Sequence, residues 1–171
     1  MSDSQGTQPP QPPEIKRTLQ FHLTQLIGVP LLAVLPVLAL LGVFGTTRGE
    51  ASAQSAALEL HVEYPTRSRY KVINAIEVSV RNLTEQPLST VTVSFDETYI
   101  SKFSNVQFTP SVKTVTDEVY RVELSDLQPG ETQLVSVEVQ AEEYGAHRGT
   151  IKVAAGEAEA AQVDLATIVF P

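Results

Sequence analysis

The sequence contains no cysteine and no tryptophan among its 171 residues. Without cysteine the chain has no disulfide, no thiolate zinc site, no cysteine-ligated iron–sulfur cluster and no thiol nucleophile. Basic residues are also scarce, with 12 lysines and arginines against 20 aspartates and glutamates. Because phosphate binding needs clustered lysine and arginine, this balance argues against nucleic acid as a partner.

The net charge of -8 is distributed unevenly along the chain. Residues 1–56 hold three acidic and three basic residues, so residues 57–171 carry all of the net charge. Hydrophobic residues make up 42% of the sequence, and they form one continuous run near the N-terminus and several alternating patterns further on. This difference predicts two parts that occupy different environments.

Residues 1–20 begin with the proline-rich segment MSDSQGTQPPQPPEI. The segment has almost no large apolar residue, so it cannot bury enough surface to offset the entropy lost on ordering. Its Pro-Pro-Gln-Pro-Pro sequence favours the extended polyproline II conformation. We expect a disordered cytoplasmic tail here, and the alternative is a docking peptide for a neighbouring subunit.

Residues 21–46 contain a run of 19 residues, from Leu26 to Phe44, without a charge or a strongly polar group. A helix of that length covers roughly 28 Å, which is close to the hydrocarbon thickness of a bilayer. The run therefore predicts a single transmembrane helix. The alternative is a cleavable signal peptide, since an Ala-Ser-Ala sequence follows at 51–53, but the apolar run is longer than a usual signal-peptide core.

Four residues of this segment are candidate helix-packing positions: Gly28, Pro30, Pro36 and Gly42. Each proline removes a backbone donor and can kink the helix, which membrane helices tolerate better than soluble ones. The glycines offer small surfaces at which another helix can approach closely.

The flanking charges predict how the helix is oriented. Lys16 and Arg17 precede the apolar run, whereas only Arg48 follows it closely. The positive-inside rule then places the N-terminus in the cytoplasm of a bacterial cell and the C-terminal domain in the periplasm. Residues 47–56 are small and polar, so we expect a flexible linker between the helix and the domain.

From residue 57 onward the apolar residues recur with a period of two. The alternating positions include Leu58, Leu60, Val62, Ile76, Val78, Val80, Val91, Val93, Phe95, Val135, Val137, Val139, Ile151, Val153, Val163 and Leu165. Alternation rich in β-branched residues is typical of half-buried strands. With turn sequences between the runs, residues 57–171 predict a mainly β fold, an immunoglobulin-like antiparallel β-sandwich of seven or eight strands. Phe95, Phe103 and Phe108 then have to help fill a core that lacks tryptophan.

Two stretches of the domain resemble known modules. The sequence IEVSVRNLTEQPLSTVTVSF is similar to the second and third strands of bacterial fibronectin-III-like or CARDB-like adhesion modules, and VELSDLQPGETQLVSVEV is similar to a Pro-Gly-Glu corner of the same modules. The resemblance implies a β-sandwich that binds or spaces other proteins. It implies no catalytic residue.

The segment from Pro65 to Lys71 is the one basic cluster of the acidic domain. Arg67, Arg69, Tyr70 and Lys71 are therefore candidate partner-binding residues. An anionic lipid surface and a plain solvated loop are the alternatives. A first strand rising from the linker would carry this segment roughly 23 Å away from the bilayer, which favours a protein partner over lipid.

The segment between residues 97 and 119 shows no regular period and carries Tyr99, Phe103 and Phe108. Long connections in sandwich domains often bind partners, so Tyr99 and Phe103 are further candidate partner-binding residues. The alternative is that these aromatic rings cap the core.

No residue pattern indicates a catalytic, cofactor or metal site. His22, His61 and His147 lie far apart and form no metal-binding motif, and the acid pairs lack a calcium-loop pattern. We therefore expect a non-catalytic accessory subunit of a bacterial membrane complex, which contacts lipid and the other subunits through its helix and its β-domain. A free-standing, membrane-anchored module that binds an extracellular protein or glycan is the second hypothesis, and an enzyme is the third.

Overall fold

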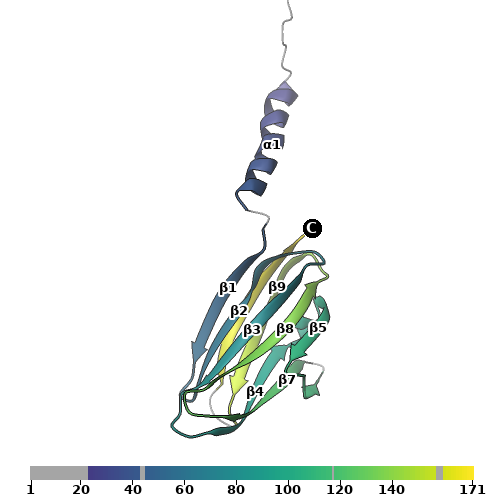
Figure 1. The fold of residues 1–171 in the computed structure, drawn as a ribbon. Coiled ribbons are helices and arrows are strands. Elements are labelled where there is room, and N and C mark those ends of the chain that lie inside the picture. The colour runs from purple at the N-terminus through teal and green to yellow at the C-terminus, as the bar shows by residue number, and fades with distance from the viewer. Residues whose placement is uncertain (1–22, 43–44, 117, 157–159) are drawn as a thin grey trace, which may run out of the picture. The chain divides into compact units, whose positions relative to one another are not determined.

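The computed structural model describes residues 23–42, 45–116, 118–156 and 160–171 (Figure 1). The chain divides into two compact units, Met1–Leu41 and Gly42–Pro171, and each is described by itself. The predicted tail over residues 1–20 lies outside the described residues, as does His22.

The first unit contains helix α1. Where the sequence predicts a membrane span over residues 21–46, the structure has α1 at Leu23–Leu40. After the helix, the Leu41 N–H donates to the Val37 carbonyl at 3.0 Å, and Gly42 takes a φ of 73°, the left-handed conformation that commonly ends helices. In the described part of the chain, no helix is both long enough and apolar enough to cross a membrane.

In its described residues, the second unit is a single curled sheet of ten strands with one short helix. The elements are β1 (Thr47–Gln54), β2 (Leu58–Arg69), β3 (Ile73–Asn82), β4 (Leu88–Asp96), α2 (Glu97–Ile100), β5 (Phe103–Thr109), β6 (Thr114–Val115), β7 (Val119–Leu127), β8 (Thr132–Ala141), β9 (Gly145–Ala154) and β10 (Ala161–Phe170). Their order in the sheet is β5-β8-β3-β2-β10-β9-β4-β7-β6, with β1 added beside β2. The predicted mainly β fold is thus confirmed.

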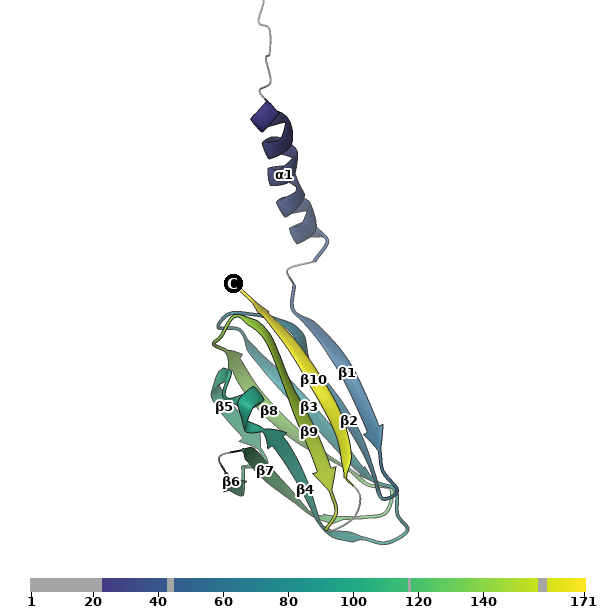
Figure 2. The ribbon, with the colours of Figure 1, turned by 180° about the vertical axis from the view of Figure 1, so that it is seen from behind.

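All neighbouring strands are antiparallel except one pair. The end of β10 runs parallel to the end of β2, with Ile168–Phe170 opposite Arg67–Arg69. This short contact joins the half-sheet β5-β8-β3-β2 to the half-sheet β10-β9-β4-β7, and the sheet curls around a core between the two halves (Figure 2).

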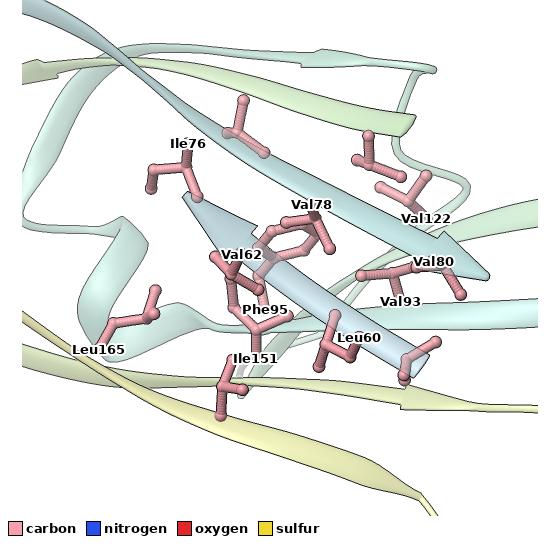
Figure 3. Packing of buried hydrophobic residues seen from close by; sticks show 14 of the residues in the cluster. Leu60, Val62, Ile76, Val78, Val80, Val93, Phe95, Val122, Ile151 and Leu165 are labelled. Carbon is pink, nitrogen blue, oxygen red and sulfur yellow. The ribbon is translucent and has the colours of Figure 1, made fainter. Parts of the chain in front are cut away.

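The core consists of the alternating aliphatic residues that the sequence singles out. Leu60, Val62, Val78 and Ile151 are at most 1% exposed, and Figure 3 shows them converging with Phe95 from both halves of the sheet. The Phe108 ring, which is half-buried, meets Phe95 edge-on at a centroid distance of 5.3 Å. Close packing of this kind stabilises a domain that has no disulfide.

The expected linker over residues 47–56 is wrong, because residues 47–54 form strand β1. It pairs with β2 in an antiparallel register in which Ala51 lies opposite Val62 and Ala53 opposite Leu60. Both alanines pack against the core, while Ser52 between them faces outward. Residues 47–54 have low strand propensity, and they form a strand because they pair with β2.

Two other segments expected to be loops are also more regular. The strand β2 continues through Arg69, so most of the basic segment is paired strand, with Pro65 and Ser68 buried. The segment between residues 97 and 119 contains α2, β5 and β6, and β5 pairs with β8.

Candidate functional site

One end of the second unit gathers most of its predicted partner-binding residues, on the end of β2 and the turn after it. The strand β1 begins and β10 ends at this end (Figures 1 and 2). The Tyr70 N–H donates to the Phe170 carbonyl and the Lys71 N–H to the Ala141 carbonyl, both at 2.8 Å. These bonds hold the β2–β3 turn, residues 70–72, against the end of β10 and against the β8–β9 turn, residues 142–144. We call these two turns, with the adjoining strand ends, the proximal end, because the chain arrives there from α1.

The basic residues of the proximal end come from β2 and the turn after it. Arg67 and Arg69 are exposed at the end of β2, on the same side because they are two residues apart. Lys71 has a φ of 59°, and its Nζ lies 5.3 Å from the centre of the Tyr70 ring. This places an ammonium group over an aromatic face at a distance that permits a cation–π contact.

Apolar side chains are exposed beside these charges. The Tyr70 and Tyr144 rings lie 4.8 Å apart at an angle of 40°, and Tyr144 is 56% exposed. Val72, Ile73 and Ile168 are exposed by 37%, 63% and 43%. The described part of the second unit exposes six large hydrophobic side chains, and four of them are at this end, the other two being Val115 and Leu134.

The acidic residues of the proximal end are engaged with neighbouring side chains. Glu143 in the β8–β9 turn forms an ion pair with Lys102, with Nζ 3.1 Å from Oε2. Glu142 accepts a hydrogen bond from the Ser104 hydroxyl at 3.2 Å. The structure therefore brings Arg67, Arg69, Tyr70 and Lys71 together, as the sequence predicts, but on a strand end and turn that also present apolar surface.

Tyr99 and Phe103 are placed differently from the prediction. Their side chains are 2% and 6% exposed, and their rings meet edge-on at 5.2 Å inside the core. The Tyr99 hydroxyl bonds to the Thr167 hydroxyl at 2.7 Å, and Thr167 donates in turn to the Pro65 carbonyl at 2.6 Å. Burial raises the pKa of Tyr99 to about 12. Both rings cap the core, which is the alternative that the sequence left open.

The helix-packing candidates have two distinct settings. Pro30 and Pro36 lie inside α1, and a Cβ added to Gly28 would meet nothing within 4 Å. Gly28 thus leaves open space on the helix surface. Gly42 instead follows the end of the helix and has a positive φ, a backbone conformation that favours glycine, so the helix end alone accounts for a glycine there.

The remaining polar candidates are absorbed by the fold. Asp96 caps α2 by accepting from the Thr98 N–H at 2.9 Å. His147 is buried, and its Nε2 bonds to the Glu143 carbonyl at 2.9 Å, whereas His61 lies on a strand surface. Within the ranges that the structure describes, no group of three or more His, Asp or Glu residues could hold a metal ion.

A second surface feature lies at the opposite end of the sandwich, and sequence reasoning missed it. A groove of about 680 Å³ runs over the outer side of β4 and β7. Its lining includes the hydroxyl-bearing Ser89, Thr90, Thr92 and Ser94 from β4, and one pair of charged residues, Arg121 and Glu123, from β7. In the sequence, the Ser and Thr that alternate with the apolar residues of β4 indicate only the outward positions of a strand.

The apolar part of the proximal end was also missed, although the sequence contains a signal for it. Ile168 occupies an outward position in the β10 alternation, where the preceding outward residues, Gln162, Asp164 and Ala166, are polar or small. Ile73 similarly precedes the regular alternation of β3. An apolar residue at a polar position of the period is therefore the signal.

Comparisons with known proteins show only distant likeness. No family model matches the chain, and no curated protein is similar to it in sequence. A CARDB domain from Pyrococcus furiosus is 13% identical, with a TM-score of 0.42, over 72% of this chain and 91% of that domain. The bacterial hydrophobin BslA is 11% identical, with a TM-score of 0.39, over 74% of this chain and all of that one. A beta-glucosidase from Listeria innocua is 15% identical, with a TM-score of 0.37, over 74% of this chain and 16% of the enzyme. We take neither a family nor a function from likeness at this level.

Proposed function

We propose that the protein is a non-catalytic accessory subunit of a multi-subunit bacterial membrane complex. In this proposal α1 anchors the chain in the inner membrane and contacts neighbouring helices. The β-sandwich lies on the periplasmic side and braces partner subunits.

The observation that carries the proposal is the apolar surface around α1. Ile27, Leu31, Leu32 and Leu40 are exposed by 63%, 66%, 68% and 88%, and these positions fall on more than one side of a helix. The uncharged run of the sequence continues past the helix as far as Phe44. Exposing such a surface to water is unfavourable by about 25 cal/mol per Å², so lipid or partner helices are its expected surroundings.

The architecture of the second unit supports a bracing role. An aliphatic core between the two halves of the sheet makes a tightly packed body suited to holding other proteins at a fixed position. Arg48 adds to this packing, because its Nη1 lies 3.8 Å from the Glu63 carboxylate and 3.6 Å from the Glu77 carboxylate, which links β1 to β2 and β3.

The proposal is tested by extracting the full chain from its native membrane in mild detergent. Native sizing and mass spectrometry should show a particle heavier than the monomer that contains other membrane subunits. A monodisperse monomer would contradict the proposal.

A variant pair examines the helix contact in the same extract. Gly28→Leu fills space that is empty in the chain itself, so it should reduce co-purification only if a partner helix packs there. Ala39→Leu adds comparable bulk at another exposed position of α1 and serves as the matched control. Equal recovery of partner subunits with both variants would show that Gly28 does not contact a partner helix.

The groove on β4 and β7 favours a second candidate function, a free-standing binding module. Its serine and threonine hydroxyls can donate and accept hydrogen bonds, which suits a glycan or an extended peptide. For this candidate the extracted protein should be a monomer, and Thr92→Leu should abolish ligand capture while leaving the fold intact. Stable co-purification of subunits would argue against it.

A further inference from the structure

Because β1 pairs antiparallel with β2, the start of the second unit lies beside the end of β2. The chain arrives at Thr47, runs down β1 to Gln54, and returns along β2 to Arg69. Thr47 lies opposite Arg67 in the β1–β2 register, so the start of the domain and its basic segment are at the same end. The basic segment is therefore not separated from the start of the domain by the length of a strand, as expected from the sequence.

The covalent connection limits how far the proximal end can be from the anchor. Six residues separate Leu40, the last residue of α1, from Thr47, and an extended chain spans at most roughly 25 Å over these seven Cα-to-Cα steps. Arg67 is on the neighbouring strand, about 5 Å further. If α1 is anchored in a bilayer, the proximal end is within reach of the headgroup layer.

We propose that the proximal end docks onto the anionic headgroups of the membrane that holds α1. Arg67, Arg69 and Lys71 would bind phosphates, and Tyr70 and Tyr144 would sit at the boundary between headgroups and acyl chains. This inference rests on the membrane anchor of the proposed function.

The composition of the proximal end matches an interfacial surface. Tyrosine is enriched at membrane interfaces because its ring is apolar and its hydroxyl is polar. Each basic residue near an anionic surface contributes attraction that salt screens. The exposed Val72 and Ile73 add apolar area beside these groups, and an acidic domain gains an attractive face only where its bases are gathered.

The absence of cysteine makes a direct test possible, because one introduced cysteine is labelled without background. The full chain bearing Val72→Cys, labelled with the environment-sensitive dye NBD, is reconstituted into phosphatidylcholine vesicles with or without phosphatidylglycerol. NBD emission should rise roughly twofold or more, with a blue shift, only in the anionic vesicles, and high salt should reverse the change. Glu85→Cys, exposed in the β3–β4 connection at the opposite end, should report water in both vesicles.

Charge variants identify the residues responsible. Neutralising Arg67, Arg69 and Lys71 together to Gln should abolish the change at position 72. The matched control neutralises three bases elsewhere on the domain, Arg81, Lys113 and Arg121, and should preserve it. Circular dichroism checks that both triple variants are folded.

The outcomes separate the docking from the anchor. Protein that fails to float with vesicles after alkaline carbonate treatment contradicts the anchor itself. Protein that floats but whose label at position 72 reports water in both vesicles contradicts the docking and leaves a protein partner as the occupant of the proximal end. A change that is equal in neutral vesicles, or that high salt does not reverse, contradicts recognition of anionic headgroups.

Discussion

Tyr99 must be the donor in its hydrogen bond to Thr167, because Thr167 gives its single hydroxyl hydrogen to the Pro65 carbonyl. Substitutions of Tyr99 and of Thr167 should therefore lower the free energy of unfolding by different amounts. Tyr99→Phe removes one bond and leaves Thr167 satisfied, so it should lower the free energy of unfolding by about 1 kcal/mol. Thr167→Val leaves the buried Tyr99 hydroxyl without its partner and removes a hydrogen bond to the Pro65 carbonyl, so it should cost about 3 kcal/mol. Urea unfolding measures both free energies, and equal losses would contradict this order of donors, in which Tyr99 donates to Thr167 and Thr167 donates to Pro65.

The same hydroxyl predicts a pH dependence at high pH. Burial raises the pKa of Tyr99 from 10.0 to about 12, so between these values the unfolded chain releases the proton while the folded protein keeps it. The contribution is complete below pH 10 and is lost as the pH rises through the folded-state pKa, by about 3 kcal/mol in all. The wild type, about 1 kcal/mol more stable than Tyr99→Phe at neutral pH, should therefore become the less stable of the two as the pH rises from 10 to 12. Parallel curves for the two proteins would contradict this prediction.

Gly149 is explained by contact and not by its backbone angle. A Cβ at this position would lie 2.2 Å from the Cβ of Tyr99 and 2.5 Å from its Cγ, atoms that cannot move aside without shifting α2. Gly149→Ala should lower the free energy of unfolding by about 3 kcal/mol. Gly130→Ala is the comparison, since Gly130 has a φ of 72° and open space, so only about 1 kcal/mol of backbone strain is expected. A smaller loss at Gly149 than at Gly130 would refute the contact argument.

At the scale of elements, regular alternation was sufficient to predict the core strands. Where the period breaks, the sequence misleads. In β5, Asn105 has a φ of 50° and the register with β8 shifts between Ser104 and Gln107, so the apolar Phe103, Val106 and Phe108 are not evenly spaced. A bulge of this kind hides a strand from any search for a period of two.

The strand β1 was hidden for a different reason. Apart from Thr47, its sequence, TRGEASAQ, has none of the β-branched or aromatic residues that favour strands, and its stability comes from pairing with β2.

The candidate surface at the proximal end could also be predicted only in part from the sequence, because strand pairing brings some of its residues together. The charges of the proximal end were visible as neighbours in sequence, but Tyr144 and Ile168 join them only through the sheet.

A matched pair of substitutions distinguishes a strand from a linker at β1. Ala51 packs against the core opposite Val62, so Ala51→Asp places a charge in apolar surroundings and should cost about 2 kcal/mol. Ser52 faces outward, so Ser52→Asp should change the free energy of unfolding by less than about 0.5 kcal/mol. Thermal and urea unfolding of the two variants check the difference. If both were neutral, residues 47–54 would behave as a linker.

For the whole molecule, the distribution of charge makes a prediction about topology. Lys16 and Arg17 precede the apolar run, whereas Arg48, the base that follows it, belongs to the folded domain through its ion pairs with Glu63 and Glu77. The positive-inside rule then predicts that the N-terminus is in the cytoplasm and that the domain, with its net charge of -8, is exported.

Single cysteines in the full chain read out this orientation in intact spheroplasts. A membrane-impermeant maleimide should label Ser125→Cys, an exposed residue of β7, and should leave Ser4→Cys unlabelled until the cells are lysed. Exchanging Lys16 and Arg17 for Glu removes the bases that hold the N-terminus inside, so the labelling ratio should shift toward Ser4→Cys. Labelling of Ser4→Cys alone in the unaltered chain would reverse the orientation, and it would place the proximal end on the cytoplasmic leaflet, where anionic lipid would still be its expected contact.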